Sequence, residues 1–230
     1  LESLSTAQLV AIETVDFASL STDAVVALTT LQAANLTTAQ VASMTTAQLV
    51  KMQTADFVAL ASDRLASLTS VQVGVLTTDQ LVAMTTAQVA VLTTDQVLSL
   101  TTEQTASLKT AQIAAMTTKQ VVALTTAQVS TLTTAQMAAL TTKQVAVLET
   151  DDLQSVTTAQ LVALTTAQVV AFTTDQVVAL TTDQVSNLKT AQLAALTTKQ
   201  VAVLETDDLQ SVTTAQLVAM TTAQVAAMTT

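Results

Sequence analysis

The chain lacks several residue types on which enzyme chemistry depends. Its 230 residues include no cysteine and no histidine. The absence of cysteine excludes disulfides, thiolate metal sites and cysteine nucleophiles, and the absence of histidine removes the usual zinc ligand and general base. No Ser/His/Asp set, glycine-rich phosphate loop or pair of buried carboxylates can be assembled from what remains. We therefore expect a protein that is not an enzyme, with no catalytic, cofactor-binding or metal-binding residues.

Basic residues are also scarce, and this limits the partners of the protein. Seven Lys and Arg residues stand against 17 Asp and Glu residues, which gives a formal net charge of −10. An acidic surface repels phosphate groups, so we expect no nucleic acid partner and no attraction to anionic membranes. Apolar runs end after a few residues, well short of the roughly 20 that span a bilayer, so we expect no membrane insertion.

Aromatic residues, glycine and proline are nearly absent as well. The chain has three Phe, one Gly and no Pro, although half of its residues are hydrophobic. The core must therefore be a thin, uniform strip of Leu, Val, Met and Ala.

What the chain does contain is an eight-residue unit, here called the octad, repeated without insertion or deletion. The commonest octad reads Leu-Thr-Thr-Ala-Gln-Val-Val-Ala, as in residues 164–171. Position one, counted from Leu4 to Met228, is a large apolar residue throughout. Such a period predicts one continuous array over residues 1–230, in which each repeat packs on its neighbours. Because both ends cut through an octad, we expect an excerpt of a longer array.

The distribution of charge over the octad predicts which positions are buried. Of the 24 charged residues, 22 lie at positions two, four and five, and none lies at positions one, three or six. Position six is a large apolar residue, except at Ala33 and Thr105. Since an unpaired charge is costly to bury, positions one and six are predicted to form the core.

The same pattern predicts a short helix that restarts in every octad. In a continuous helix, eight residues overshoot two turns by roughly 80°, so the apolar stripe would wind around the helix. Thr at position two and Gln at position five, such as Thr165 and Gln168, have the spacing of a capping box that starts a new helix. Helices this short must be held by their neighbours.

The residue that caps each helix is less certain from the sequence. Position three is always Thr or Ser, whereas position two is sometimes a poor capping residue. The second Thr of each pair is therefore an alternative cap, with the helix starting one residue later. The poor caps are Glu13, Gln53, Ala61, Lys109, Glu149, Lys189 and Glu205.

A β-solenoid is the alternative fold. It would stack Thr and Gln in ladders and would explain the many β-branched residues. However, its corners need Gly, Pro or Asn, and its strands disfavour the frequent Ala. An all-α solenoid with one very short helix per octad is therefore the predicted fold class.

The acidic residues, the methionines and the Thr residues are the three groups of side chains that are candidates for binding sites. The acidic pairs Asp151/Asp152 and Asp207/Asp208 carry oxygen ligands suited to Ca²⁺, but no glycine-assisted turn is near them, so we interpret them as solvated acids at helix starts. Asp16 and Asp56 receive the same interpretation. The methionines are expected to fill the core. The Thr lattice could match ordered water, as ice-binding surfaces do, but capping already accounts for its hydroxyls.

Octads such as residues 164–171 resemble the Leu-Thr-Thr-x-Gln octapeptide tracts of very large repetitive surface or secreted proteins of proteobacteria, including adhesin-like ones. The resemblance covers the whole chain. It implies an extended extracellular stalk or fibre. The calcium-binding Gly-Asp nonapeptides of those proteins are absent here.

The octad is also similar to the opening helix of the repeats in transcription activator-like effectors. The long repeat, its base-reading loop with Gly and its basic balance are all missing, so the similarity does not imply DNA recognition.

These observations predict a non-enzymatic structural repeat protein, acting as a spacer, stalk or fibre segment of a large bacterial surface or secreted protein. The expected partners are neighbouring repeats or other copies of the chain, with cell-surface or matrix proteins as further candidates. The alternative is a solenoid scaffold that binds a protein or peptide, including self-association into filaments. A binding groove should concentrate variable residues on one face, whereas the charges here are scattered and no aromatic anchors accompany them.

Overall fold

The computed structural model describes residues 1–228, and this part of the chain forms 28 short α-helices and no strand. Each octad contributes one helix of four to six residues. The predicted all-α solenoid is therefore confirmed, and the β-solenoid alternative is wrong.

The helices fall into two compact units, Leu1–Met116 and Thr117–Thr230, which are described separately. The helices of the first unit are α1 (Thr6–Val10), α2 (Thr14–Ser19), α3 (Thr22–Val26), α4 (Thr30–Asn35), α5 (Thr38–Ser43), α6 (Thr46–Lys51), α7 (Thr54–Ala59), α8 (Ser62–Ala66), α9 (Ser70–Gly74), α10 (Thr78–Ala83), α11 (Thr86–Ala90), α12 (Thr94–Leu98), α13 (Thr102–Ser107) and α14 (Thr110–Ala115). Those of the second are α15 (Thr118–Val122), α16 (Thr126–Thr131), α17 (Thr134–Ala139), α18 (Thr142–Val145), α19 (Thr150–Ser155), α20 (Thr158–Ala163), α21 (Thr166–Val170), α22 (Thr174–Val178), α23 (Thr182–Asn187), α24 (Thr190–Ala195), α25 (Thr198–Val201), α26 (Thr206–Ser211), α27 (Thr214–Val218) and α28 (Thr222–Ala227).

Each helix begins at position three, and the residue at position two is its N-cap. In α21, the Thr165 hydroxyl accepts a hydrogen bond from the Gln168 backbone N–H, and the Gln168 side chain accepts one from the Thr165 N–H. Twenty of the helices in the described residues have this complete box with a Ser or Thr cap. The capping-box prediction is confirmed.

The alternative register, with the second Thr as cap, is wrong. Position three is the first helical residue in every helix of the described chain. The seven poor caps also occupy the N-cap position, and their side chains make no capping bond. At Lys109 and Lys189 the Gln half of the box is kept, since each backbone N–H donates to the Gln three residues later. Helix starts therefore survive the loss of the hydroxyl.

Each helix ends without a left-handed residue. No residue in the described chain, the glycine included, has a positive φ. Instead, position one is extended, as at Leu36 (φ −55°, ψ 142°), and the next N-cap is extended too, as at Thr37 (φ −76°, ψ 157°). Two extended residues therefore turn the chain between helices, which explains why it needs so little Gly. Because the usual left-handed cap is missing, the last helical carbonyl groups need another donor.

The core is formed by positions one and six, as predicted. Position six is fully buried at Val169 and Phe57, and position one is almost fully buried at Leu164 and Met52. Exposure rises only in the first and last turns, where a neighbouring turn lies on one side only: Leu4 is partly exposed, and Leu217 is 43% exposed. The two exceptions at position six, Ala33 and Thr105, are buried as well.

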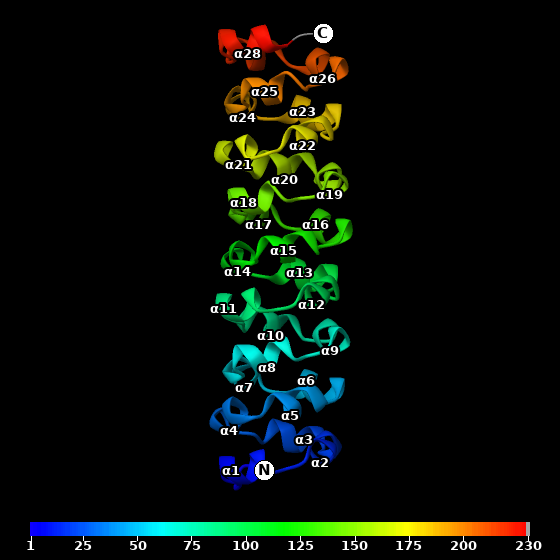
Figure 1. The fold of residues 1–230 in the computed structure, drawn as a ribbon, viewed down its shortest axis with the longest axis vertical. Coiled ribbons are helices and arrows are strands. Elements are labelled where there is room, and N and C mark those ends of the chain that lie inside the picture. The colour runs from blue at the N-terminus through cyan, green and yellow to red at the C-terminus, as the bar shows by residue number, and fades with distance from the viewer. Residues whose placement is uncertain (229–230) are drawn as a thin grey trace. The chain divides into compact units, whose positions relative to one another are not determined.

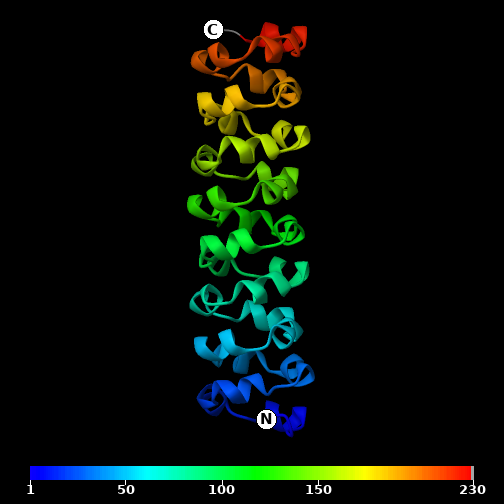
Figure 2. The ribbon, with the colours of Figure 1, turned by 180° about the vertical axis from the view of Figure 1, so that it is seen from behind.

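Within each unit, a helix packs mainly on the helix three places further along. Contacts of this kind join α4 with α7 and α17 with α20. Figure 1 shows the helices of each unit following one another in chain order, and Figure 2 shows helices on the opposite side too, so each unit coils around its own core. Stacking of this kind brings octads that are far apart in sequence into contact.

A matched pair of substitutions in α21 tests the buried face. Val169→Ala should lower the free energy of unfolding by about 2 kcal/mol, because it removes fully buried methyl groups and leaves a cavity. Val170→Ala, at a side chain that is 40% exposed, should change it by less than about 0.5 kcal/mol. Urea unfolding followed by circular dichroism measures both. Equal losses would contradict the assignment of position six to the core.

A second pair tests the capping register. Thr165→Ala removes an N-cap hydroxyl and should cost about 1 kcal/mol of stability, whereas Thr166→Ala, at the first helical residue, should cost much less. Both side chains are exposed, so burial does not confuse the comparison. The reverse order in thermal unfolding would show that the second Thr is the cap.

Candidate functional site

The most distinctive polar group in the structure is the Gln side chain at position five. This Gln occurs in 22 of the 28 octads that have the position. It is buried almost completely, between 1% and 5% exposed from Gln32 onward in the octads that keep it. A buried amide is stable only when its donors and its acceptor are paired.

Each Gln pairs with two different turns of the solenoid. The side chain of Gln184 accepts a hydrogen bond at Oε1 from the Thr181 N–H of its own octad, at 2.9 Å. Its Nε2 donates to the carbonyl oxygens of Leu153 (2.9 Å) and Val156 (2.7 Å), which lie at the end of α19. One side chain thus takes part in the cap of its own helix and also donates to carbonyl groups at the end of another helix, about 30 residues earlier in the sequence.

The same connection recurs throughout the described chain. In 17 octads, Nε2 donates to the position-one carbonyl 28 residues earlier, over 2.5 to 3.0 Å. Many of these amides also reach a carbonyl of the last helical turn, 30 or 31 residues earlier. Because a Gln contacts the end of the helix four places back, while helices stack three places apart, one turn holds between three and four octads.

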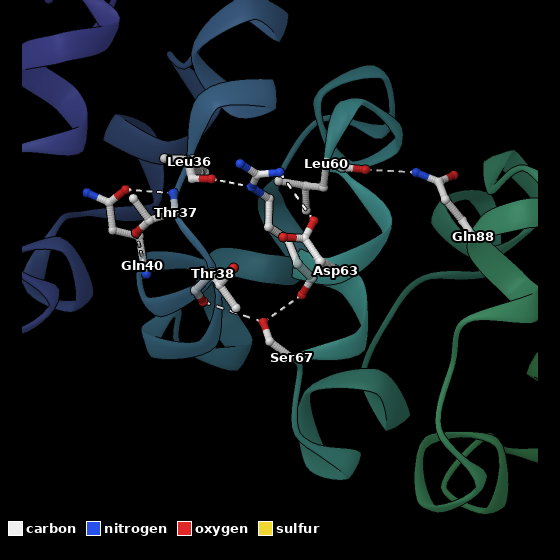
Figure 3. A network of polar contacts seen from close by, with 9 residues as sticks. Leu36, Thr37, Thr38, Gln40, Leu60, Asp63, Ser67 and Gln88 are labelled. Carbon is white, nitrogen blue, oxygen red and sulfur yellow. Dashed lines mark hydrogen bonds and ion pairs between the residues drawn. The ribbon is translucent and has the colours of Figure 1, made fainter.

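Arg64 shows that the donor matters more than the amide itself. It occupies position five of its octad, and its Nε donates to the Leu36 carbonyl 28 residues earlier (Figure 3). Its Nη1 also forms an ion pair with Asp63 at 3.3 Å. In the next turn of the same figure, Gln88 donates to the Leu60 carbonyl at 2.9 Å. A guanidinium therefore replaces the amide without changing the connection between turns.

Asp replaces Gln at position five in four octads, and three of these four residues depart from the prediction of solvated acids. Asp16, Asp151 and Asp207 are exposed as predicted, but Asp152 is only 3% and Asp208 only 2% exposed. Asp56 is also buried, at 3%. The prediction is therefore wrong for Asp56, Asp152 and Asp208, because position five faces the neighbouring turn.

The buried carboxyl groups are only partly hydrogen-bonded. Thr126 donates its hydroxyl to Asp152 Oδ1, and Thr30 donates to Asp56 Oδ1, each at 2.7 Å. The second oxygen, Oδ2, is buried without a partner in Asp56, Asp152 and Asp208. Burial raises the pKa of Asp152, the hydrogen bond from Thr126 lowers it, and the negative charges of Glu149 and Asp151 raise it further.

Other candidate sites carry less chemistry. Six of the seven methionines are buried in the core, with Met137 fully buried and Met44 at 3%, as predicted for filling residues, and Met228 in the last turn is partly exposed. The described residues contain no group of three or more acidic side chains placed to hold a metal ion. None of the described helices has the length and apolar character needed to cross a membrane. One open groove in the first unit is lined by Thr22, Thr46, Ala47, Val50, Lys51 and Val75.

A substitution at Gln184 tests the connection between turns. Gln184→Glu keeps the length and the acceptor but removes the donor, so at neutral pH it should lower the free energy of unfolding by about 2–3 kcal/mol. Acidification should lessen the loss, because a protonated carboxyl can donate again. Gln154→Glu, at an exposed position seven, is the matched control. Equal effects of the two changes on urea unfolding would contradict a structural role for the amide.

The repeat itself matches a known family. A family pattern described as the ALTTAQ repeat matches residues 9–46, 49–86, 81–110, 105–142, 123–150, 145–182 and 201–230. No curated protein matches the chain. Since these segments together cover well over half of the sequence, the chain belongs to the ALTTAQ repeat family.

Proposed function

We propose that this chain is an extended spacer, stalk or fibre segment of a large bacterial surface or secreted protein. Its membership of a repeat family and its solenoid fold make it a structural repeat protein. The observation that carries the finer proposal is the uniformity of the connection between turns. Nearly every octad gives its neighbours the same apolar pair and the same amide donor, so the array can add or lose repeats without creating a new kind of contact.

The sequence supports length as the property under selection. Residues 140–163 recur identically as residues 196–219, a shift of 56 residues or seven octads. With between three and four octads per turn, seven octads make about two turns, so the inserted segment returns the chain to a similar place on the solenoid. Duplication of this kind lengthens the array while preserving both register and orientation.

The proposal extends to the partners and location of the protein. We infer one continuous array over residues 1–230, whose main partners are neighbouring repeats and other copies of the chain. Cell-surface or matrix proteins are further candidates. The net charge of −10 disfavours nucleic acid, and the short helices disfavour membrane insertion. An extracellular location follows from the resemblance to repetitive surface proteins.

A binding scaffold is the second candidate function, and the groove of the first unit is the place that favours it. Val50 and Val75 are each 38% exposed there, and Lys51 is the only charged side chain in its lining. The remaining lining residues are Thr and Ala, so the groove offers apolar contact but few directional bonds. Compared with the connection between turns, which recurs along both units, this groove is a local feature.

Deletion of residues 140–195 tests the spacer function. The deletion joins Ala139 to Leu196, which recreates the local sequence at Leu140. We expect the helical signal per residue in circular dichroism to stay constant, because every remaining octad keeps its neighbours. The longest dimension in small-angle scattering should shorten by about a quarter, in proportion to the repeats removed.

Two results would contradict the spacer function. An unchanged longest dimension would show that length does not follow repeat number, and a loss of helical signal would show that the array is not modular. As a control, deletion of residues 140–193 removes 54 residues and breaks the octad register, and it should unfold the turns around the join.

A further inference from the structure

The buried Asp residues at position five occur with a specific change at position two. In all four octads with Asp at position five, position two holds Glu or Gln instead of Thr or Ser. The pairs are Glu13/Asp16, Gln53/Asp56, Glu149/Asp152 and Glu205/Asp208. The long and short side chains have exchanged places, so these octads form a class of their own.

In one of these octads the missing donor is supplied by position two. Gln53 Nε2 donates to the Val26 carbonyl at 2.8 Å, which lies 30 residues before Asp56. A Gln at position five reaches the corresponding carbonyl in other octads, as Gln88 reaches Val58. The amide has therefore moved from position five to position two, and the connection to the preceding turn is kept.

The octads of Asp152 and Asp208 have no such replacement. Their position-two residues are Glu149 and Glu205, and neither an ionised Glu nor an ionised Asp has a hydrogen to donate. By the register of the other octads, a Gln at residue 152 would donate to carbonyl groups among residues 121–124, at the end of α15. Asp152 Oδ2 is buried and has no partner at this joint.

The charges around Asp152 also disfavour its ionised form. Its own octad carries Glu149 and Asp151, α16 carries no charged residue, and α22 adds Asp175. The basic residues in the neighbouring helices are Lys119 on α15 and Lys143 on α18, and both side chains are exposed. Burial, together with these acids, raises the pKa of Asp152 above that of an exposed Asp, against the opposing effect of the Thr126 hydrogen bond.

We propose that Asp152 is a proton-dependent joint between turns of the solenoid. A proton taken from solvent neutralises the carboxyl group. Oδ1 then continues to accept from the Thr126 hydroxyl, while the protonated Oδ2 donates to the carbonyl groups at the end of α15. The neutral carboxyl then has one acceptor and one donor, as the Gln amide has, although its acceptor pairs with Thr126 and not with the N–H of its own cap, so mild acid tightens the turns that this octad connects.

The direction of the pH effect follows from the proton affinity. Because the pKa of Asp152 in the folded chain lies above 3.8, the folded state binds the proton more tightly than the unfolded state. The stability that this residue contributes is therefore complete below 3.8 and is lost as the pH rises through the folded pKa.

Asp152→Asn tests the proposal, with Asp151→Asn as the matched control on the exposed neighbouring residue. The amide of Asn carries a permanent donor, so Asp152→Asn should raise the unfolding midpoint at neutral pH, and its advantage over wild type should shrink as the pH falls through the folded pKa of Asp152 toward 3.8. Asp151→Asn removes a charge that raises the pKa of Asp152, so it should move the pH dependence of the wild type to lower pH without abolishing it.

A second measurement reports on the carboxyl group of the wild-type protein directly and does not depend on a difference in stability between variants. Carbon-13 NMR of Asp-labelled wild-type protein should show a carboxyl resonance, assigned to Asp152 by its absence in Asp152→Asn, that titrates above 3.8. Titration at or below that value would overturn the proposal. So would stabilisation of wild type by Ca²⁺ at neutral pH that Asp152→Asn abolishes, because the joint would then hold a cation in place of a proton.

Discussion

The hydrogen bonds of the Gln amide are the constraint on which the rest of the structure depends. A helix of four to six residues leaves a large share of its carbonyl groups without an internal partner, and in this chain no left-handed residue closes the helix ends. Those ends are buried between turns, where an unpaired carbonyl is costly. The amide at position five donates to these carbonyl groups from the neighbouring turn, and it thereby links the start of one helix to the end of another. Short helices, extended corners and the stacking of turns are therefore parts of a single arrangement.

This arrangement also explains the unusual composition. Corners made from two extended residues need neither Gly nor Pro, and the apolar residues at positions one and six need only to fill a narrow strip, so aromatic side chains are rarely required. Position two tolerates Lys because the backbone N–H of the cap still donates to Gln, and because neighbouring turns hold the helix in place. The Gln at position five has both an acceptor and a donor role. Two replacements at position five show how the donor is kept. Arg64 is itself a donor, whereas in the octad of Asp56 the donor is Gln53 at position two.

The sequence predicts those features that depend on contacts within one octad. The buried faces at Leu164 and Val169 and the capping box of Thr165 with Gln168 follow from spacing alone, and they are confirmed. The sequence does not reveal the second role of Gln168, because its acceptors at Met137 and Leu140 lie at a separation set by the number of octads per turn. The burial of Asp152 is missed for the same reason, although its pairing with Glu149 at position two was a visible signal. The invariant Thr at position three misleads, because it is the first helical residue and not the cap.

The amide connections also have a direction along the chain. In every octad where the bond is described, the donor belongs to the later residue and the acceptor to the earlier one, as from Gln184 back to Val156. A ribosome releases the earlier residues first, so the carbonyl groups to which a Gln donates leave the ribosome before the Gln itself. The turns that have left the ribosome thus act as a template for the next turn. Synthesis and assembly of the array both proceed from the N-terminus to the C-terminus.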